Sequence, residues 1–213
     1  MTWSGKVLSV KASTINNEAQ EVIGSAALIR DITEEKRLEE ELKKRSITDG
    51  LTGLHNRRHF DKTLDNEFKR WKRYKTPMSV IMLDVDHFKK FNDTHGHECG
   101  DHVLIAIGGV LRAQTQKAQA LVIPFRYGGE ELVVIAANTR QESAADLAEI
   151  LRREISELVI DGLRVTVSIG VAGTPAQTPA TADALLKLAD EALYAAKEGG
   201  RNQVMTAPLD TAA

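Results

Sequence analysis

Residues 121–136 read LVIPFRYGGEELVVIA, in which two apolar runs flank Gly128 and Gly129. Glycine adopts the backbone angles that tight turns require, so this stretch predicts two antiparallel strands joined by a hairpin turn. Two carboxylates, Glu130 and Glu131, follow the glycines directly. The turn therefore combines an approachable backbone with acidic side chains.

The chain on either side of this hairpin alternates between strand and helix patterns. Around the hairpin the order is strand, helix, hairpin, helix, strand. This order predicts an α/β domain (an α+β sandwich) with the ferredoxin-like or palm β-α-β-β-α-β sheet, mostly antiparallel and covered by helices on one face. Ser143 and Asp146 resemble a capping box, so the helix after the hairpin is expected to begin there. The expected strands are 79–83, 121–127, 131–136, 164–172 and 203–205, and the expected helices are 57–75, 101–113, 143–158 and 182–198.

The N-terminal part has a different pattern. Residues 5–30 alternate apolar and polar positions around a turn, which predicts a hairpin, and two strands alone do not make a stable domain. Residues 33–45 carry acidic and basic side chains four apart, with Leu38 and Leu42 on one face. This spacing predicts a helix. A solvated linker helix and one strand of a dimeric coiled coil fit the thin apolar seam equally well.

Composition excludes several classes of function. With 28 basic and 30 acidic residues among 213, the net charge is -2, so the chain lacks the basic face that wraps a nucleic-acid polymer. The single cysteine, Cys99, cannot form a disulfide within the chain, which is typical of a reducing compartment. No stretch resembles a secretion signal or approaches the ~20 apolar residues that span a bilayer. We therefore expect a cytoplasmic protein without a membrane segment.

Carboxylates stand at two places that the predicted sheet can bring together. Asp84 follows an apolar strand directly, and Glu130 follows the hairpin glycines. Each alone fits an ordinary polar turn, but together they can converge on a hard cation, for which magnesium bound partly through substrate phosphates is the natural candidate. Two such ions can activate a hydroxyl and neutralise charge at phosphorus. The pattern points to nucleotidyl transfer.

From Asp49 to about Val204 the sequence resembles a GGDEF domain, the catalytic domain of bacterial diguanylate cyclases. The resemblance implies an enzyme that condenses two GTP molecules into cyclic di-GMP and two pyrophosphates, by attack of a ribose 3′-hydroxyl on an α-phosphate across a homodimer. The matching blocks are DGLTGLHNRR (49–58), DVDHFKKFND (84–93), HGH (95–97), GD (100–101), RYGGEEL (126–132), SIGVA (168–172), ADEALYAAK (189–197) and RN (201–202).

The resemblance also implies the roles of individual residues. Asp84, Glu130 and the main-chain carbonyl of Val85 match the metal ligands, with Glu131 close enough to assist, for two Mg²⁺ or Mn²⁺ ions per active site. The implied catalytic residues are Asp84, Lys89 near the reacting phosphates, and Glu130, which would help to deprotonate the attacking hydroxyl. The implied substrate contacts are Asn92 and Asp101 at the guanine, Phe88 and His87 in the pocket wall, Gly128 and Gly129 beside the phosphates, and Lys197 and Arg201 at the β- and γ-phosphates.

The N-terminal sequence IRDITE (29–34) resembles the end of a PAS sensor domain, which runs through such a junction into a signalling helix. Only about the last two strands of a PAS domain would be present, so the chain looks truncated. The expected domains are a C-terminal PAS fragment (1–32), a signalling or coiled-coil linker helix (33–47), a GGDEF catalytic domain (48–206) and a disordered tail (207–213).

Three positions depart from the family pattern. Leu132 replaces the usual Phe, which is expected to change packing and not chemistry, and His87 replaces an aromatic residue near the pocket. The window of the Arg-x-x-Asp product-inhibition motif, Gln119 to Val122, reads QALV. It lacks the guanidinium and carboxylate that clamp cyclic di-GMP, so this feedback is expected to be lost.

Other functions remain open. The main alternative is a catalytically silent GGDEF-like module that binds GTP and regulates a partner, although no implied metal or guanine contact is missing. A cyclic di-GMP receptor is disfavoured by the missing Arg-x-x-Asp, and a polymerase palm or a cyclase acting on ATP is disfavoured by Asn92 and Asp101. A zinc site among four histidines and Cys99 has no established ligand spacing.

Overall fold

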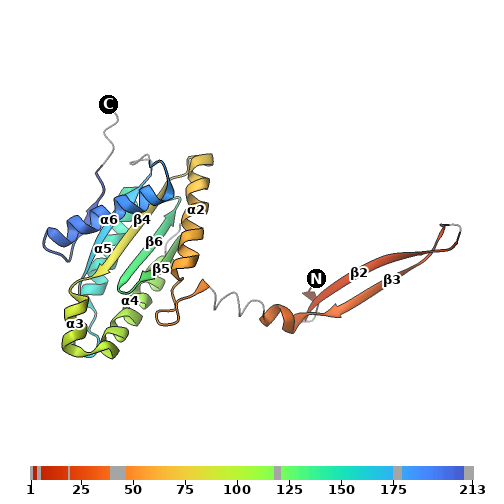
Figure 1. Cartoon of the computed structure of the whole chain (residues 1–213), viewed down its shortest axis with the longest axis horizontal. Coiled ribbons are helices and arrows are strands. Elements are labelled where there is room, and N and C mark those ends of the chain that lie inside the picture. Colours follow the sequence, from red (N-terminus) through yellow and green to blue (C-terminus); the bar gives the residue numbers. More distant parts are fainter. Residues whose placement is uncertain are drawn as a thin grey trace. The chain divides into compact units, whose positions relative to one another are not determined.

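A computed structural model of the chain describes residues 2–3, 6–18, 20–38, 47–117, 121–174 and 179–208. The chain divides into two compact units, Met1–Ser46 and Ile47–Ala213, each of which is described by itself (Figure 1). Within the described ranges, no helix has the length and apolar character needed to cross a membrane.

The N-terminal unit is an antiparallel ribbon followed by a short helical segment. Strands β2 (Lys6–Asn16) and β3 (Val22–Asp31) pair along most of their length, as the alternating pattern predicted, and β1 (Thr2–Trp3) pairs with β2. Residues 33–38 are helical. The rest of the predicted helix, 39–45, lies outside the described residues.

A network of hydrogen bonds joins this ribbon to its helix. Asp31 Oδ1 accepts from the amide and the hydroxyl of Thr33, at 3.0 and 2.6 Å, and that hydroxyl in turn accepts from the Val7 amide at 2.8 Å. Lys6 Nζ lies 3.1 Å from Asp31 Oδ2. These partners, Thr33 foremost, lower the pKa of Asp31 to about 2.

The C-terminal unit is built on a five-stranded sheet with the order β5-β6-β4-β7-β8. All neighbours are antiparallel except β7 and β8, which are parallel. This sheet confirms the predicted α/β class and its ferredoxin-like core, although β7 begins three residues later than predicted. The strands are β4 (Met78–Val85), β5 (Val122–Gly128), β6 (Glu131–Ala137), β7 (Val167–Gly173) and β8 (Val204–Thr206).

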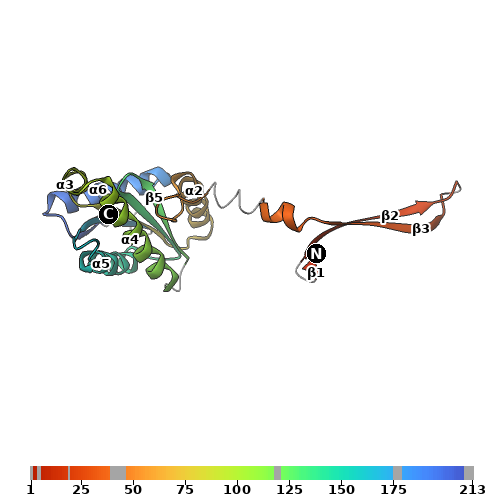
Figure 2. The same ribbon diagram turned by 90° about the horizontal axis from the view of Figure 1, so that it is seen from below.

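Helices cover both faces of the sheet, so the expectation that they cover one face was wrong. Helices α2 (Arg57–Tyr74) and α6 (Ala182–Glu198) pack on one face, and α4 (His97–Lys117) and α5 (Gln141–Glu157) pack on the other (Figure 2). Every residue of β4 is buried because alternate side chains enter two separate hydrophobic cores. A central strand with apolar side chains on both faces needs cover on both sides.

Three helices begin where the local pattern did not place them. Helix α4 begins at His97, four residues before its predicted start at 101. Helix α3 (Phe88–His95) was not predicted, because its polar sequence buries Phe88 alone. Helix α5 begins at Gln141, two residues before the predicted capping box, and Gln141 is buried. Its Oε1 accepts from Gly173 N and its Nε2 donates to Ala207 O, both at 2.9 Å. These distant partners set the start of α5, and they show that Ala207 is packed against the domain.

Candidate active site

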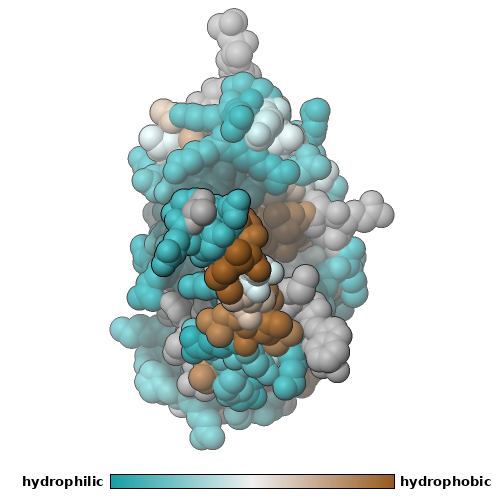
Figure 3. All heavy atoms as spheres, turned by 90° about the vertical axis from the view of Figure 1, so that its right-hand side faces the viewer, coloured by the Kyte–Doolittle hydropathy of each residue, from teal (hydrophilic) through white to brown (hydrophobic). Residues whose placement is uncertain are grey.

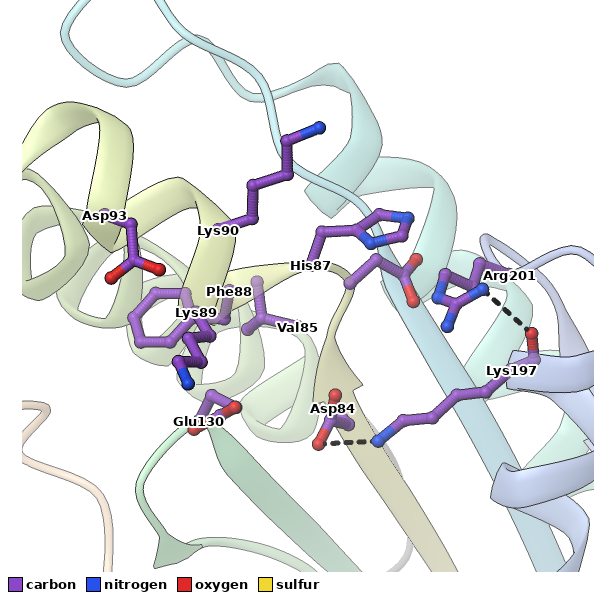
Figure 4. A pocket seen from close by; sticks show the side chains of 11 residues that line it. Asp84, Val85, His87, Phe88, Lys89, Lys90, Asp93, Glu130, Lys197 and Arg201 are labelled. Atoms are coloured by element: carbon purple, nitrogen blue, oxygen red, sulfur yellow. Dashed lines mark hydrogen bonds and ion pairs between the residues drawn. The ribbon is translucent and has the colours of Figure 1, made fainter.

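The end of β4 and the turn between β5 and β6 meet at one edge of the sheet. Asp84 on β4 lies directly opposite Glu131 on β6 in the strand register, and Glu130 precedes Glu131 in the turn. Asp84 and Glu130 border a pocket of about 390 Å³ (Figure 4). The pocket is lined by Asp84, Val85, Asp86, His87, Phe88, Lys89, Lys90, Asp93, Glu130, Lys197 and Arg201.

Asp84 is a buried carboxylate, 8% exposed, that faces a lysine. Lys197 Nζ lies 2.9 Å from Asp84 Oδ2, an ion pair drawn as a dashed line in Figure 4. Burial raises the pKa of Asp84, and Glu130 and Asp86 add to that rise. Lys197 opposes them without reversing the direction. The site therefore favours additional positive charge beside Asp84.

The pKa of Glu131 is raised as well, by burial first and then by the negative charge of Asp84. Among the residues that the structure describes, no three His, Cys, Asp or Glu side chains are grouped so that they could hold a metal ion alone. Proteins commonly bind Mg²⁺ through one or two carboxylates together with substrate phosphates. Asp84, Glu130 and the main-chain carbonyl of Val85 fit that donor set, and the surplus negative charge at Asp84 and Glu131 suits a cation.

A second pocket, of about 470 Å³, adjoins the first and shares four lining residues with it. Asn92 on α3 and Asp101 on α4 line this pocket. The buried Oδ1 of Asn92 has no hydrogen-bond partner in the described part of the chain. A Cβ at Gly100 would overlap this oxygen, so glycine at 100 leaves the space that the carboxamide occupies. The fold thus leaves the carboxamide oxygen of Asn92 without a protein partner beside the carboxylate pocket.

Arg126 holds the glycine turn from outside. Its Nε and Nη2 donate to Gly129 O at 3.1 and 3.0 Å, and its Nη1 lies 3.2 Å from Asp49 Oδ1. Asp49 Oδ1 also accepts from the amide and the hydroxyl of Thr52, at 2.8 and 2.7 Å. Burial raises the pKa of Asp49, but Thr52 and Arg126 outweigh burial and lower it overall. Because φ of Gly129 is +46°, glycine suits this turn.

The end of α6 brings two cations to the carboxylate pocket. Thr181 caps the start of α6 by accepting from Ala184 N at 3.1 Å, and the apolar stripe of the helix packs against the sheet. Lys197 lies in the last turn and Arg201 lies just beyond it, with Arg201 Nη1 donating to Lys197 O at 3.3 Å (Figure 4). Both line the same pocket as Asp84.

A family model described as "Diguanylate cyclase, GGDEF domain" matches residues 46–203. This chain belongs to the GGDEF family. Diguanylate cyclase DgcM of Escherichia coli (strain K12) is 40% identical over 181 residues, which cover 84% of this chain and 43% of that protein. Response regulator PleD of Caulobacter vibrioides (strain NA1000 / CB15N) is 44% identical over 166 residues, which cover 75% and 36%. The chain spans less than half the length of these relatives.

Solved structures agree with this family. The coiled coil and GGDEF domain of DgcB from Caulobacter crescentus, in complex with c-di-GMP, has a TM-score of 0.73 and 35% identity, covering 82% of this chain and 94% of that chain. The active GGEEF domain of a diguanylate cyclase from Vibrio cholerae has a TM-score of 0.67 and 30% identity, covering 73% and 98%. They support the predicted palm-like sandwich fold.

Most of the predicted site residues of this GGDEF domain line one of the two adjoining pockets. Two line neither of them: Glu131, whose pKa is raised in part by the charge of Asp84, and Gly128, which pairs with Glu131 in the strand register. In the product-inhibition window, Gln119 lies outside the described residues and Val122 begins β5.

Sequence reasoning missed six residues that line these pockets, namely Asp86, Lys90, Asp93, His97, Leu104 and Arg126. A signal for Asp86 was available, because it stands two positions after Asp84, just beyond the predicted strand 79–83. Leu132, the departure in the turn motif, is fully buried in the core, as its apolar character predicted.

Proposed function

We propose that this GGDEF domain is an active diguanylate cyclase that condenses two GTP molecules into cyclic di-GMP and two pyrophosphates. The main support is the junction of the two pockets. One pocket is bordered by carboxylates and cations that suit a triphosphate with its metal ions. The other is bordered by Asp101 and by Asn92, whose carboxamide oxygen has no hydrogen-bond partner in the described part of the chain. One nucleotide can lie across both, with its phosphates and its base at opposite ends.

In this proposal the second pocket reads guanine. The Asp101 carboxylate accepts from N1–H and the exocyclic amine of guanine, a pair of donors that adenine does not present together. The Asn92 carboxamide offers a further polar group that the fold leaves unpaired. Phe88 and His87 form the wall between base and phosphates. A site built to accept hydrogen bonds disfavours a base that lacks the donors.

The first pocket holds the triphosphate. Lys197 and Arg201 bind the β- and γ-phosphates and Lys89 lies near the reacting phosphate, while Gly128 and Gly129 let the backbone approach. Binding of a triphosphate gives the Lys197 ammonium an anion other than Asp84. Two Mg²⁺ or Mn²⁺ ions, held by Asp84, Glu130, the Val85 carbonyl and Glu131, would supply charge neutralisation at the phosphates and activation of the attacking hydroxyl.

Bond formation requires two domains. Each domain holds one GTP, so the ribose 3′-oxygen of one nucleotide attacks the α-phosphorus of the other, and the bond to the pyrophosphate oxygen breaks. Glu130 helps to accept the proton that the 3′-hydroxyl loses. Two such steps close the ring and release two pyrophosphates, so the enzyme acts as a homodimer.

The N-terminal unit has a regulatory role in this proposal. We propose that residues 1–32 are the end of a PAS sensor domain and that 33–47 form a signalling helix, which sets the geometry between two cytoplasmic catalytic domains. The hydrogen bonds of Asp31 and Thr33 support this role, because they fix the helix to the last strand of the ribbon. The DgcB structure, in which a coiled coil accompanies the GGDEF domain, is consistent with this role.

The first test incubates the purified protein with GTP and Mg²⁺ and separates the nucleotides by chromatography, with ATP and chelator controls. We expect cyclic di-GMP with GTP and metal only. Glu130→Ala should lower product formation by about 100-fold or more, the usual loss when one preorganised electrostatic group is removed. Glu142→Ala, an exposed residue of α5, is the matched control. Tight GTP binding without turnover by the wild type would instead support the silent module.

A further inference from the structure

We propose that Asp86 is a positioning residue for substrate binding, which holds Arg201 at the phosphate pocket by fixing the turn after α6. Asp86 was not among the predicted site residues, and although it lines the phosphate pocket, its hydrogen bonds go to protein donors. Because Arg201 is a phosphate contact only in the function proposed above, this role of Asp86 rests on that proposal.

The Asp86 carboxylate is committed to three protein donors. Its Oδ1 accepts from the Ser168 hydroxyl at 2.6 Å, and its Oδ2 accepts from the Thr166 hydroxyl at 2.6 Å and the Asn202 amide at 3.0 Å. The residue is 8% exposed. Asp84, two residues earlier, instead pairs with the ammonium of Lys197. The two carboxylates at the end of β4 therefore have different roles. Asp84 faces the ligand, and Asp86 hydrogen-bonds to other parts of the protein.

The turn that Asp86 holds has an unusual backbone. Gly200, Arg201 and Asn202 all have positive φ, at +113°, +63° and +44°. Residues with a side chain rarely adopt such angles in succession, and they persist only where surrounding contacts enforce them. The Arg201 amide donates to Ala196 O at 3.0 Å, which closes the end of α6. The Asn202 amide, the next along the chain, needs the Asp86 carboxylate.

A second anchor holds the same turn from α5. Arg152 Nη1 donates to Asn202 Oδ1 at 2.8 Å, and Glu149 holds Arg152 through its Nε and Nη2. Asn202 is thus fixed at its main chain by Asp86 and at its side chain by Arg152. Since Arg201 is its direct neighbour, the direction of the Arg201 side chain depends on both anchors. Losing either should loosen Arg201, and the loss of Arg152 does so without changing a residue that lines the pocket.

The test measures binding of 3′-deoxy-GTP, which lacks the attacking hydroxyl and so cannot react, and of GMP, which lacks the β- and γ-phosphates. In the intact chain with Mg²⁺, Asp86→Asn should weaken binding of 3′-deoxy-GTP about tenfold and leave GMP within about twofold. In an Arg201→Ala background, Asp86→Asn should cause no further loss. Equal weakening of both ligands, or losses that multiply in the double variant, would overturn the proposal.

Arg152→Ala keeps the proposal testable if Asp86→Asn does not fold, because Arg152 lies outside both nucleotide pockets. We expect about threefold weaker 3′-deoxy-GTP binding, unchanged GMP binding, and no effect in the Arg201→Ala background. Arg153→Ala, an exposed arginine one position further on the same helix, is the matched control and should bind both ligands as the wild type does. An Arg152→Ala variant that binds like the control would count against the proposal.

The proposed function can fail separately. If the wild type binds 3′-deoxy-ATP as tightly as 3′-deoxy-GTP, the proposed recognition of guanine is wrong. The dependence of Arg201 on Asp86 is still measured, because it is the difference between triphosphate and monophosphate binding.

Discussion

The two units of the chain contain similar apolar residues but bury them very differently. In the C-terminal unit Phe125 is 0% exposed and lies between the sheet and α2. In the N-terminal ribbon Leu28 is 68% exposed, and it is accompanied by other large exposed apolar side chains. Figure 3, turned so that the right-hand side of Figure 1 faces the viewer, shows an apolar patch near the middle of this face.

This difference shows which of the two units buries enough apolar surface to be stable by itself. The GGDEF domain has a five-stranded sheet with a hydrophobic core on each face, so its fold depends on its own residues. A ribbon of two long strands and one short one buries too little apolar surface to offset the entropy of folding. Another surface against its apolar side chains would therefore stabilise the ribbon.

The largest expected effect is a difference in the free energy of unfolding between two large-to-small substitutions, one in each unit. Phe125→Ala removes a fully buried ring and should lower the free energy of unfolding of the domain by about 3–5 kcal/mol. Leu28→Ala, at an exposed position of β3, should change it by less than about 0.5 kcal/mol. Urea unfolding monitored by circular dichroism measures both. A comparable loss for Leu28→Ala would mean that the ribbon is covered in solution and is part of the same cooperative unit.

The next effect concerns the buried charge of the active site. Because burial raises the pKa of Asp84, its stability contribution is greatest at acidic pH and is lost as the pH rises through its folded-state pKa. Asp84→Asn should therefore raise the melting temperature of the metal-free protein near pH 8. The same variant should abolish product formation, because it loses a proposed metal ligand. Lys197, whose side chain is 32% exposed, can return to water.

Thermal unfolding at several pH values checks this sign, with Asp146→Asn on the exposed face of α5 as control. The advantage of Asp84→Asn should shrink toward pH 4. A variant that is less stable than the wild type at pH 8 would show that the ion pair with Lys197 stabilises the metal-free fold.

The smallest effect compares two similar turns, one in each unit. Asp31 accepts two bonds from Thr33 and Asp49 accepts two from Thr52, but Asp49 is also joined to Arg126. Asp49→Asn should destabilise the domain by about 1–3 kcal/mol at pH 7, because it breaks a partly buried charged network. Asp31→Asn should leave the unfolding transition of the domain unchanged.

Since the pKa of Asp49 is lowered from 3.8, its contribution is present above that value and is lost as the pH falls through the folded-state pKa. Unfolding of wild type and Asp49→Asn should therefore converge as the pH falls below 3.8. If Asp31→Asn matched Asp49→Asn in size, the two units would unfold together.

Local patterns predicted much of this molecule. The order of strands and helices followed from apolar periodicity and turn residues, which act over a few positions. The carboxylates Asp84 and Glu130 were found because each follows an apolar strand or a glycine turn directly. Helix α3 was missed because its composition is polar, and the start of α5 was missed because Gln141 takes its partners from β7 and from Ala207.

The sequence by itself determined the family, the α/β class and the residue types of the candidate site, because motif residues are neighbours in the chain. Only the tertiary structure decided that helices cover both faces of the sheet, that Arg126 joins Asp49 to the glycine turn, and that Asp86 serves the fold. The donors to Asp86 are 80, 82 and 116 residues further along the chain. No local pattern reports a contact over such separations, since strand pairing and helix packing create it.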